Sequence, residues 1–314
     1  MKRKIKSLIY NACILMISII IIYVFLTYVI GYRGYYTEGF QVKSQWNGPP
    51  FISGGVFQSI CDYSIDNLYP LIPYDADIKK GDRVFMKVID IPAFLESPPP
   101  VAVTVVISNS DETFDDELMM KLKPHVTAVY AINCSAPSAI QIPIGFRDDQ
   151  YTPHRDLLDI LVNPEIPEEK TTLCLVNFLL DTNGGERKRA LDIFSSQSWV
   201  TVDKTYLNYG LSKSLTFTTP ETVQKRLDYY KTLKQTKFVV CPSGMGVDTH
   251  RIYETLFFGG IPIIKTSFLD PMYERLGGCW IVKDWTEVTE EECNKRWISM
   301  KKGALITEAA EWLS

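Results

Sequence analysis

Two glycines, an arginine and a glutamate lie close together in one stretch of the chain, and their types suit an anion site. Gly244 and Gly246 would let the backbone come close to a ligand, and Arg251 can fork onto phosphate oxygens. Glu254 follows three residues after Arg251, so on a helix the two side chains share nearly the same face. A carboxylate there can accept two hydrogen bonds from ribose hydroxyls. The stretch therefore predicts a site for a nucleoside diphosphate.

The elements around this stretch would place it over the edge of a sheet. The pattern predicts a buried strand over residues 238–241, a loop over 242–249, a helix over 250–258 and a strand over 260–264. In such a β-loop-α-β unit the unpaired amides at the start of the helix point toward the carboxyl end of the strand. An anionic diphosphate is the natural occupant.

Simpler interpretations of the same residues stay open. Arg251 and Glu254 could form a surface ion pair, and loop glycines are common in turns. A dinucleotide fold is the nearest mechanistic rival, but Thr249 stands where the third glycine of G-x-G-x-x-G belongs. No Walker sequence occurs.

The composition of the chain limits which ligands and partners we expect. The 314 residues are 46% hydrophobic and 22% charged with a net charge of −4, as in a globular protein without a broad basic face, so nucleic acid is not expected as a partner. His125, His154 and His250 are far apart and no CxxC occurs, so we expect no structural zinc. We interpret Asp75 and Asp77, the one DxD sequence, as part of a solvated turn, and predict no metal site and no cofactor.

The N-terminus predicts a membrane anchor. Residues 1–7 are basic and residues 8–30 carry no charge, which is long enough for a helix to cross a bilayer. A cleaved signal peptide is the alternative, but the apolar run is too long and no small-residue cleavage site follows. We expect a type II protein with a cytosolic tail, a signal anchor, a stem over 31–50, and a folded part in the Golgi or ER lumen or on an equivalent extracytoplasmic side.

An oxidising lumen would allow disulfides. Six cysteines lie outside the predicted span, and their pairing does not follow from their spacing: Cys61, Cys134, Cys174, Cys241, Cys279 and Cys293. Asn133, Cys134 and Ser135 form one N-glycosylation sequon, which fits a luminal location and is also a frequent chance match.

The folded part reads as two sets of α/β units. Continuous apolar runs predict buried strands over 83–88, 101–108, 126–132, 140–144 and 173–178, with helices over 115–122, up to 194, and from 219. Acidic residues and prolines over 156–170 indicate an inter-domain linker. We therefore expect one domain over residues 51–165 and a second over 166–314.

The segment 237–264, KFVVCPSGMGVDTHRIYETLFFGGIPII, resembles the donor-binding segment of exostosin-like glycosyltransferases. Shorter motifs at 270–274, 280–285, 176–178, 182–183 and 186–187 are similar to other parts of the same domain, and those at 109–111 and 142–146 to the acceptor domain. The resemblance implies a GT-B fold, with two Rossmann-like domains facing a cleft and the acceptor on the N-terminal side. It also implies a nucleotide-sugar donor, with a UDP-sugar favoured, and a glycan or glycoprotein acceptor. The resemblance further implies inversion at the anomeric carbon and a reaction that needs no metal.

Sugar transfer needs a stabilised leaving group and, for inversion, a base. Arg251, helped by Arg187, can supply the positive charge. Asp111, just past a predicted strand of the first domain, is the best-placed base, with Asp148 and Asp149 as alternatives; an Asp in this position is also often only a turn or cap residue. The predicted catalytic residues are Asp111 and Arg251. The predicted donor-binding residues are Asn183, Arg187, Ser243, Gly244, Gly246, Asp248, Thr249, His250, Arg251 and Glu254.

Two other classes of function compete. A membrane-anchored carbohydrate- or nucleotide-binding protein without turnover would bind the donor or a glycan but transfer nothing. A nicotinamide-dependent oxidoreductase is disfavoured by the missing glycine and by a luminal location, where such cofactors are scarce.

Overall fold

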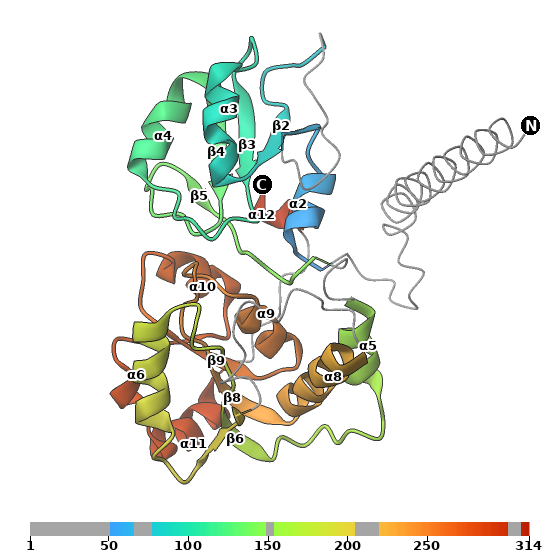
Figure 1. Cartoon of the computed structure of the whole chain (residues 1–314), viewed down its shortest axis with the longest axis vertical. Helices are drawn as coiled ribbons and strands as arrows, with labels where there is room; N and C mark the ends of the chain where they lie inside the picture. The colour runs from blue at the N-terminus through green and yellow to red at the C-terminus, as the bar shows by residue number, and fades with distance from the viewer. Residues whose placement is uncertain (1–50, 66–76, 149–153, 205–219, 301–308, 314) are drawn as a thin grey trace, which may run out of the picture. The chain divides into compact units, whose positions relative to one another are not determined.

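The structure, a computed structural model, describes residues 51–65, 77–148, 154–204, 220–300 and 309–313, which form two parallel β-sheets with helices around them (Figure 1). The predicted tail, membrane span and stem over residues 1–50 lie outside these ranges. Within the described ranges no helix is both long and apolar enough to cross a membrane. The mixed α/β architecture with two parallel sheets fits a Rossmann-like GT-B fold.

The strands of the first sheet follow one another in chain order. The order is β1 (Tyr63–Ser64), β2 (Arg83–Met86), β3 (Val103–Ile107), β4 (Val126–Ala131) and β5 (Ile140–Gln141), all parallel. The helices of this part are α2 (Gly54–Ser59), α3 (Ile91–Glu96) and α4 (Asp116–Leu122), with 3₁₀ turns at Val88–Asp90 and Lys123–His125. Because the winding never reverses among these described strands, they form no topological switch point.

The second sheet does reverse its winding. Its order is β10 (Trp280–Val282), β9 (Ile261–Lys265), β8 (Thr236–Val240), β6 (Thr172–Val176) and β7 (Val200–Val202), again all parallel. From β6 the chain adds β7 on one side and later β8 on the other. The switch point therefore lies between β6 and β8, where ligands bind in open α/β sheets.

Most of the remaining described helices surround this sheet, whereas the last one, α12, lies near α2 (Figure 1). Around the sheet are α5 (His154–Val162), α6 (Gly184–Phe194), α8 (Pro220–Lys234), α9 (His250–Phe257), α10 (Asp270–Leu276) and α11 (Glu290–Ser299). A 3₁₀ turn covers Trp285–Glu287, and α12 covers Ala309–Trp312. The predicted strands and helices in the regions 101–131, 172–194 and 220–264 are confirmed with slightly different ends. Phe238, Val239 and Val240 of β8 are completely buried, as expected for a parallel strand covered on both faces.

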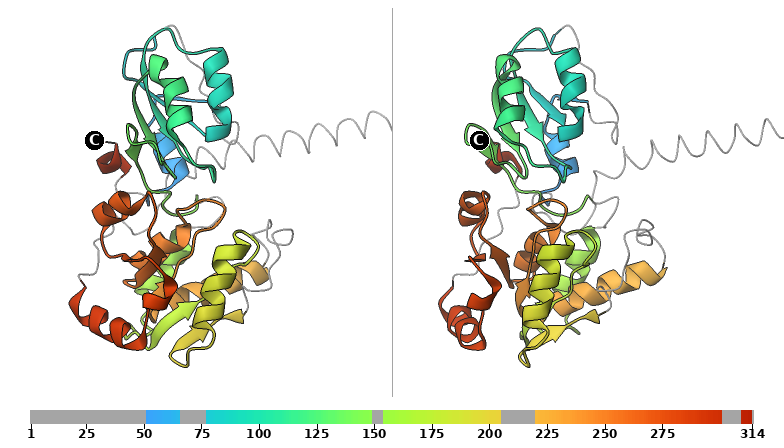
Figure 2. Two further views of the ribbon diagram at one scale, coloured as in Figure 1. Left: turned by 90° about the vertical axis from the view of Figure 1, so that its left-hand side faces the viewer. Right: turned by 60° about the vertical axis from the view of Figure 1, so that its left-hand side comes forward.

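The predicted linker over residues 156–170 is wrong in its first half, because α5 occupies it. Leu157, Leu158 and Ile160 form a buried face on this helix, which lies beside α8 (Figure 1 and Figure 2). Asp156 lies 2.5 Å from Arg226 of α8. Asp156 and Asp159, two of the acidic residues that suggested a linker, thus belong to an amphipathic helix, whereas Glu165, Glu168 and Glu169 follow its end.

Two lysines tie the ends of three helices together. The Lys234 ammonium is buried and donates to the carbonyls at the end of α5, those of Ile160 (3.1 Å), Leu161 (2.8 Å) and Asn163 (3.0 Å). The Lys170 ammonium donates to the carbonyls of Lys234, the last residue of α8 (3.0 Å), and of Phe258, just past α9 (2.7 Å). Cations are favourable at helix C-termini, where unpaired carbonyls carry partial negative charge.

Residues from both sheets share one hydrophobic core within the compact unit Pro49–Ser314. The Phe146 ring lies 6.4 Å from that of Tyr253 and 5.9 Å from that of Phe257. The Gln141 side-chain amide donates to the Phe268 carbonyl at 2.6 Å. Loops of the first sheet are therefore held against the loops that follow β8 and β9.

The structure bears on two expectations, that the cysteines could form disulfides and that Asn133 could carry a glycan. The six cysteines in the described ranges are all free, so the structure shows no disulfide among them. Asn133, the sequon residue, is completely buried, and its side-chain nitrogen donates to the Ser110 carbonyl at 3.1 Å. In the folded chain this nitrogen is not accessible for a glycan.

Candidate functional site

The loops at the carboxyl ends of β6 and β8 meet at the switch point of the second sheet. We call residues 241–249 the β8–α9 loop. The Asn183 amide, just before α6, donates to the Ser243 hydroxyl at 3.0 Å, and Arg187 Nε donates to the Ser243 carbonyl at 2.9 Å. Three residues predicted from the sequence to bind the donor are thus brought together, and they fix the start of α6 against this loop.

Arg187 is a buried cation whose hydrogen bonds go to carbonyls. Its side chain is 8% exposed, and its Nη1 donates to the Leu179 carbonyl at 2.6 Å. Among the described residues no carboxylate pairs with it and its Nη2 has no hydrogen-bond partner. Burial, and then the nearby Arg251 charge, lower the pKa of Arg187 to about 10. The positive charges of the two guanidinium groups repel each other, and an anion bound near them would reduce that repulsion.

Arg251, on the first turn of α9, reaches toward the end of β6. Its Nη1 donates to the Asn177 side-chain oxygen and to the Tyr229 hydroxyl at 3.3 Å. The guanidinium carbon also lies 5.4 Å from the centre of the Tyr229 ring, within the range of a cation–π contact. The residues that hold Arg251 are Asn177, directly after β6, and Tyr229 of α8, so its position depends on the packing of both elements.

Glu254 is buried rather than part of a surface ion pair. Its carboxylate accepts hydrogen bonds from the hydroxyls of Tyr229 at 2.9 Å and Tyr230 at 3.4 Å. Burial raises the pKa of this carboxyl, and Arg251 acts in the opposite direction. Because Tyr229 contacts both, the arginine and the glutamate belong to one network.

Three polar side-chain atoms around the switch point are buried without a hydrogen-bond partner in the described part of the chain. They are Asn177 Nδ2, Thr182 Oγ1 and Thr249 Oγ1. Thr249 is the N-cap residue of α9, yet its hydroxyl does not cap the helix. An unpaired buried polar atom costs about 1–3 kcal/mol, which a polar ligand would relieve.

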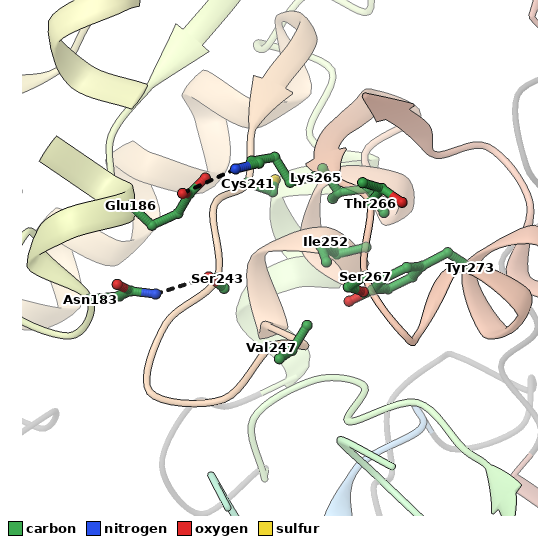
Figure 3. A pocket seen from close by; sticks show the side chains of 11 residues that line it. Asn183, Glu186, Cys241, Ser243, Val247, Ile252, Lys265, Thr266, Ser267 and Tyr273 are labelled. Carbon is green, nitrogen blue, oxygen red and sulfur yellow. Dashed lines mark hydrogen bonds and ion pairs between the residues drawn. The ribbon is translucent and has the colours of Figure 1, made fainter. Parts of the chain in front are cut away.

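A cavity of about 270 Å³ opens beside the β8–α9 loop. Asn183 and Glu186 lie on one side of it, Thr266 and Tyr273 on the opposite side, and Ser243 between them (Figure 3). Gly184 and Gly185, the first residues of α6, have open space where a side chain would project. The backbone at the start of α6 is therefore accessible to a ligand.

One ion pair forms a wall of this cavity. The Lys265 ammonium, at the end of β9, lies 3.3 Å from Glu186 Oε2, and the Trp285 indole N–H donates to Glu186 Oε1 at 2.7 Å. Both carboxylate oxygens are held, so Glu186 is a fixed group. Within the described residues no cluster of three histidine, cysteine or acidic side chains could hold a metal ion.

Asp248, predicted to bind the donor directly, is instead an anchor of the loop. Its side chain is 3% exposed. The carboxylate accepts four hydrogen bonds, from the amides of Ile144 (2.8 Å) and Thr249 (2.9 Å) and the hydroxyls of Tyr253 (2.6 Å) and Tyr273 (3.1 Å). Burial raises its pKa to about 6 although these hydrogen bonds lower it.

His250 also contacts the first-sheet side. Its Nδ1 lies 2.8 Å from the Gly145 carbonyl, and burial lowers its pKa to about 4. A neutral ring must carry its proton on Nδ1 to make this bond.

The two loop glycines make room for protein side chains. A Cβ on Gly244 would lie 2.9 Å from Arg187 Nη2, and one on Gly246 would lie 2.6 Å from Asn133 Nδ2. From the sequence we expected these glycines to let the backbone come close to a ligand. The structure shows that they admit Arg187 and Asn133 to the loop.

The predicted base, Asp111, is exposed and follows the end of β3. Partial desolvation, and then the neighbouring Glu112, raise its pKa. The alternative Asp148 accepts from the Gly55 amide at 2.7 Å and from the Asn109 amide at 3.3 Å, so α2 holds it. Asp149 and Asp75 lie outside the described residues.

Several residues of the site were not predicted from the sequence. Asn177 could have been found, since it is a polar residue directly after a buried strand at the carboxyl edge. Tyr229 is next to the apolar positions of α8, and nothing in the sequence distinguished it from a core residue of that helix. The Glu186–Lys265 pair joins residues 79 positions apart, and no local pattern links them.

Comparison with known families covers this same part of the chain. Residues 176–291 match the family model of the RXYLT1 C-terminal domain, an exostosin-related glycosyltransferase family. No match to the chain was found among curated proteins. The matched range runs from the last residue of β6 into α11 and includes Arg187, Arg251 and Glu254. The second sheet and its loops are thus similar to a glycosyltransferase domain.

Proposed function

We propose that this chain transfers a sugar from a nucleotide-sugar, a UDP-sugar in the first instance, to a glycan or glycoprotein acceptor. The observation that carries the proposal is that two arginines are held by hydrogen bonds at the switch point between β6 and β8, Arg187 on the Ser243 carbonyl and Arg251 on the Asn177 side chain. Neither composition nor fold alone would place two guanidinium groups together where a ligand is expected. The match to a glycosyltransferase family supports the same class of reaction.

The two arginines would act on the leaving group. Breaking the bond between the anomeric carbon and the diphosphate leaves the electron pair, and hence negative charge, on the phosphate oxygen. Arg187 Nη2 and the Arg251 guanidinium are fixed before the reaction by their bonds to Ser243, Leu179 and Asn177. Preorganised cations stabilise developing charge without reorganising during the step.

Glu254 would accept hydrogen bonds from the ribose hydroxyls. Its oxygens already bind two tyrosine hydroxyls, and each carboxylate oxygen can accept a further bond. Tyr229 would then couple nucleoside recognition by Glu254 to the position of Arg251.

Asp111 would accept the acceptor's hydroxyl proton while that oxygen attacks the anomeric carbon from the face opposite the diphosphate, which inverts the configuration. Its raised pKa makes it a better proton acceptor than an ordinary Asp. No metal is required by this scheme. We also propose that residues 8–30 anchor the chain as a type II protein facing the Golgi or ER lumen, because their length and lack of charge suit a bilayer span.

The full chain, purified in detergent, should be offered a panel of nucleotide-sugars, with and without EDTA. Thermal unfolding would report binding, and release of the nucleoside diphosphate would report turnover. One nucleoside diphosphate should stabilise the protein, and one sugar should be hydrolysed slowly or transferred at a rate that EDTA does not change. Stabilisation without any release would favour the binding protein without turnover. Binding of NADH alone would favour the oxidoreductase.

A further inference from the structure

The Asn133 side chain joins two loops that belong to different sheets. It lies two residues past β4 and is completely buried. Its Oδ1 accepts from the Asp248 amide at 2.8 Å, and its Nδ2 donates to the Ser110 carbonyl at 3.1 Å. One amide group thus spans from the loop after β3 to the β8–α9 loop, using one atom for each.

The backbone at this position is adapted to that task. Asn133 has φ = 46°, in the left-handed region that asparagine tolerates better than most residues. Gly246, on the opposite loop, has no side chain, and a Cβ there would lie 2.6 Å from Asn133 Nδ2. The absence of a side chain at Gly246 thus leaves the space that the Asn133 amide occupies.

Groups with proposed roles in transfer lie close in sequence to both ends of this bridge. Ser110 precedes the proposed base Asp111, and the Asp248 amide is three residues before Arg251. We propose that Asn133 is a positioning residue that sets the β8–α9 loop, with its donor-side cation, relative to the acceptor-side edge of the first sheet. This inference rests on the proposed function.

The donor half of the loop has its own supports. Ser243 is held by Asn183 and Arg187, and the Gly244 amide donates to the Gly246 carbonyl at 2.9 Å. Losing the Asn133 amide should therefore leave donor binding nearly intact. What should suffer is the alignment of the acceptor with the donor, and a displacement of about 1 Å can cost about 10²-fold in rate.

The test uses the full chain and the variant Asn133→Gly, because glycine adopts φ = 46° without strain. We expect kcat for transfer to the acceptor to fall by about tenfold or more, whereas the Kd for UDP and the rate of donor hydrolysis by water change by less than about threefold. Calorimetry gives the Kd, and chromatography separates the transfer and hydrolysis products. Thermal unfolding confirms that the variant is folded under the assay conditions.

Two matched variants separate this role from others. Ser135→Ala removes the sequon and keeps the Asn133 amide, so it should transfer like wild type and have an unchanged glycan mass. Gln141→Ala removes a different hydrogen bond between the two sheet regions, the one to the Phe268 carbonyl. It should lose stability without the selective loss of transfer.

A double-mutant cycle tests the contact itself. Gly246→Ala should push the Asn133 amide away and reproduce the loss of transfer. The three atoms nearest to the added Cβ all belong to Asn133. Alanine in the Asn133→Gly background should therefore cost little more, and the two effects should be strongly non-additive.

The outcomes distinguish the inference from the function beneath it. An active wild-type chain with an unaffected Asn133→Gly variant would overturn the inference alone. Equal losses of transfer, hydrolysis and UDP binding would also overturn it, since they would indicate a general structural role. A wild-type chain that turns over no nucleotide-sugar would refute the proposed function, and the positioning role with it.

Discussion

Replacing Arg187 by Met should separate donor binding from folding. A pKa lowered from 12.5 to about 10 means that the charged guanidinium is disfavoured in the unliganded protein by about 3 kcal/mol. Met fills similar volume and removes that penalty. It also removes two hydrogen bonds from a charged group to the carbonyls of Ser243 and Leu179, each contributing about 1.5–3 kcal/mol. The two effects nearly cancel, so unliganded stability should change by less than about 3 kcal/mol.

Binding should change much more clearly. A diphosphate that contacts Nη2 would gain a charge-assisted hydrogen bond, and its loss at about 1.5–3 kcal/mol corresponds to a Kd about 10–100-fold higher. We would measure UDP binding by calorimetry and unliganded stability by urea denaturation. Wild type should be stabilised strongly by saturating UDP, and Arg187→Met only weakly.

Arg189→Met is the matched control on the same helix. Arg189 is exposed and lies 2.5 Å from Asp284, so its loss should change neither UDP binding nor stability appreciably. The reasoning fails if Arg187→Met binds UDP as wild type does. It fails equally if that variant loses far more stability than 3 kcal/mol before any ligand is added, because Arg187 would then be a structural cation.

Other predictions concern His250, Glu254 and Asp111. Burial lowers the pKa of His250 from 6.5 to about 4, so its neutral ring contributes stability above pH 6.5 that is lost as pH falls through 4. The variant His250→Asn lacks this titrating group. Its free energy of unfolding in urea, relative to that of wild type, should therefore rise by about 3 kcal/mol from pH 7 to pH 4. A difference that stays constant with pH would contradict the lowered pKa of His250. Glu254→Gln should weaken UDP binding more than pyrophosphate binding, and equal losses would exclude the ribose contact. Asp111→Asn should lower kcat by about 10²–10⁴-fold with an unchanged Kd for UDP, and a normal rate would exclude it as the base.

The β8–loop–α9 unit could be predicted because its strand, glycines and helix are contiguous in sequence, and hydrophobic periodicity indicates local secondary structure. The sequence alone did not show that β6 lies next to β8, which brings Asn177 to Arg251 across 74 positions. The hydrogen bonds of Asp248 could not be predicted for the same reason, because its partners Ile144 and Tyr273 come from distant segments. The α5 region was misread because its acidic face resembles linker composition, while its apolar face becomes meaningful only against α8.

The buried lysine at the end of α8 offers a way to follow motion in this part of the protein. Lys234 has its ammonium surrounded by three carbonyls, so an amine-acylating reagent cannot reach it while α5 and α8 remain together. Exposed lysines such as Lys188 and Lys295 should react within the first seconds and serve as internal standards. The labelling rate at Lys234, read by peptide mass spectrometry, would then measure how often these two helices separate, and the same rate with UDP present would show whether nucleotide binding slows that opening.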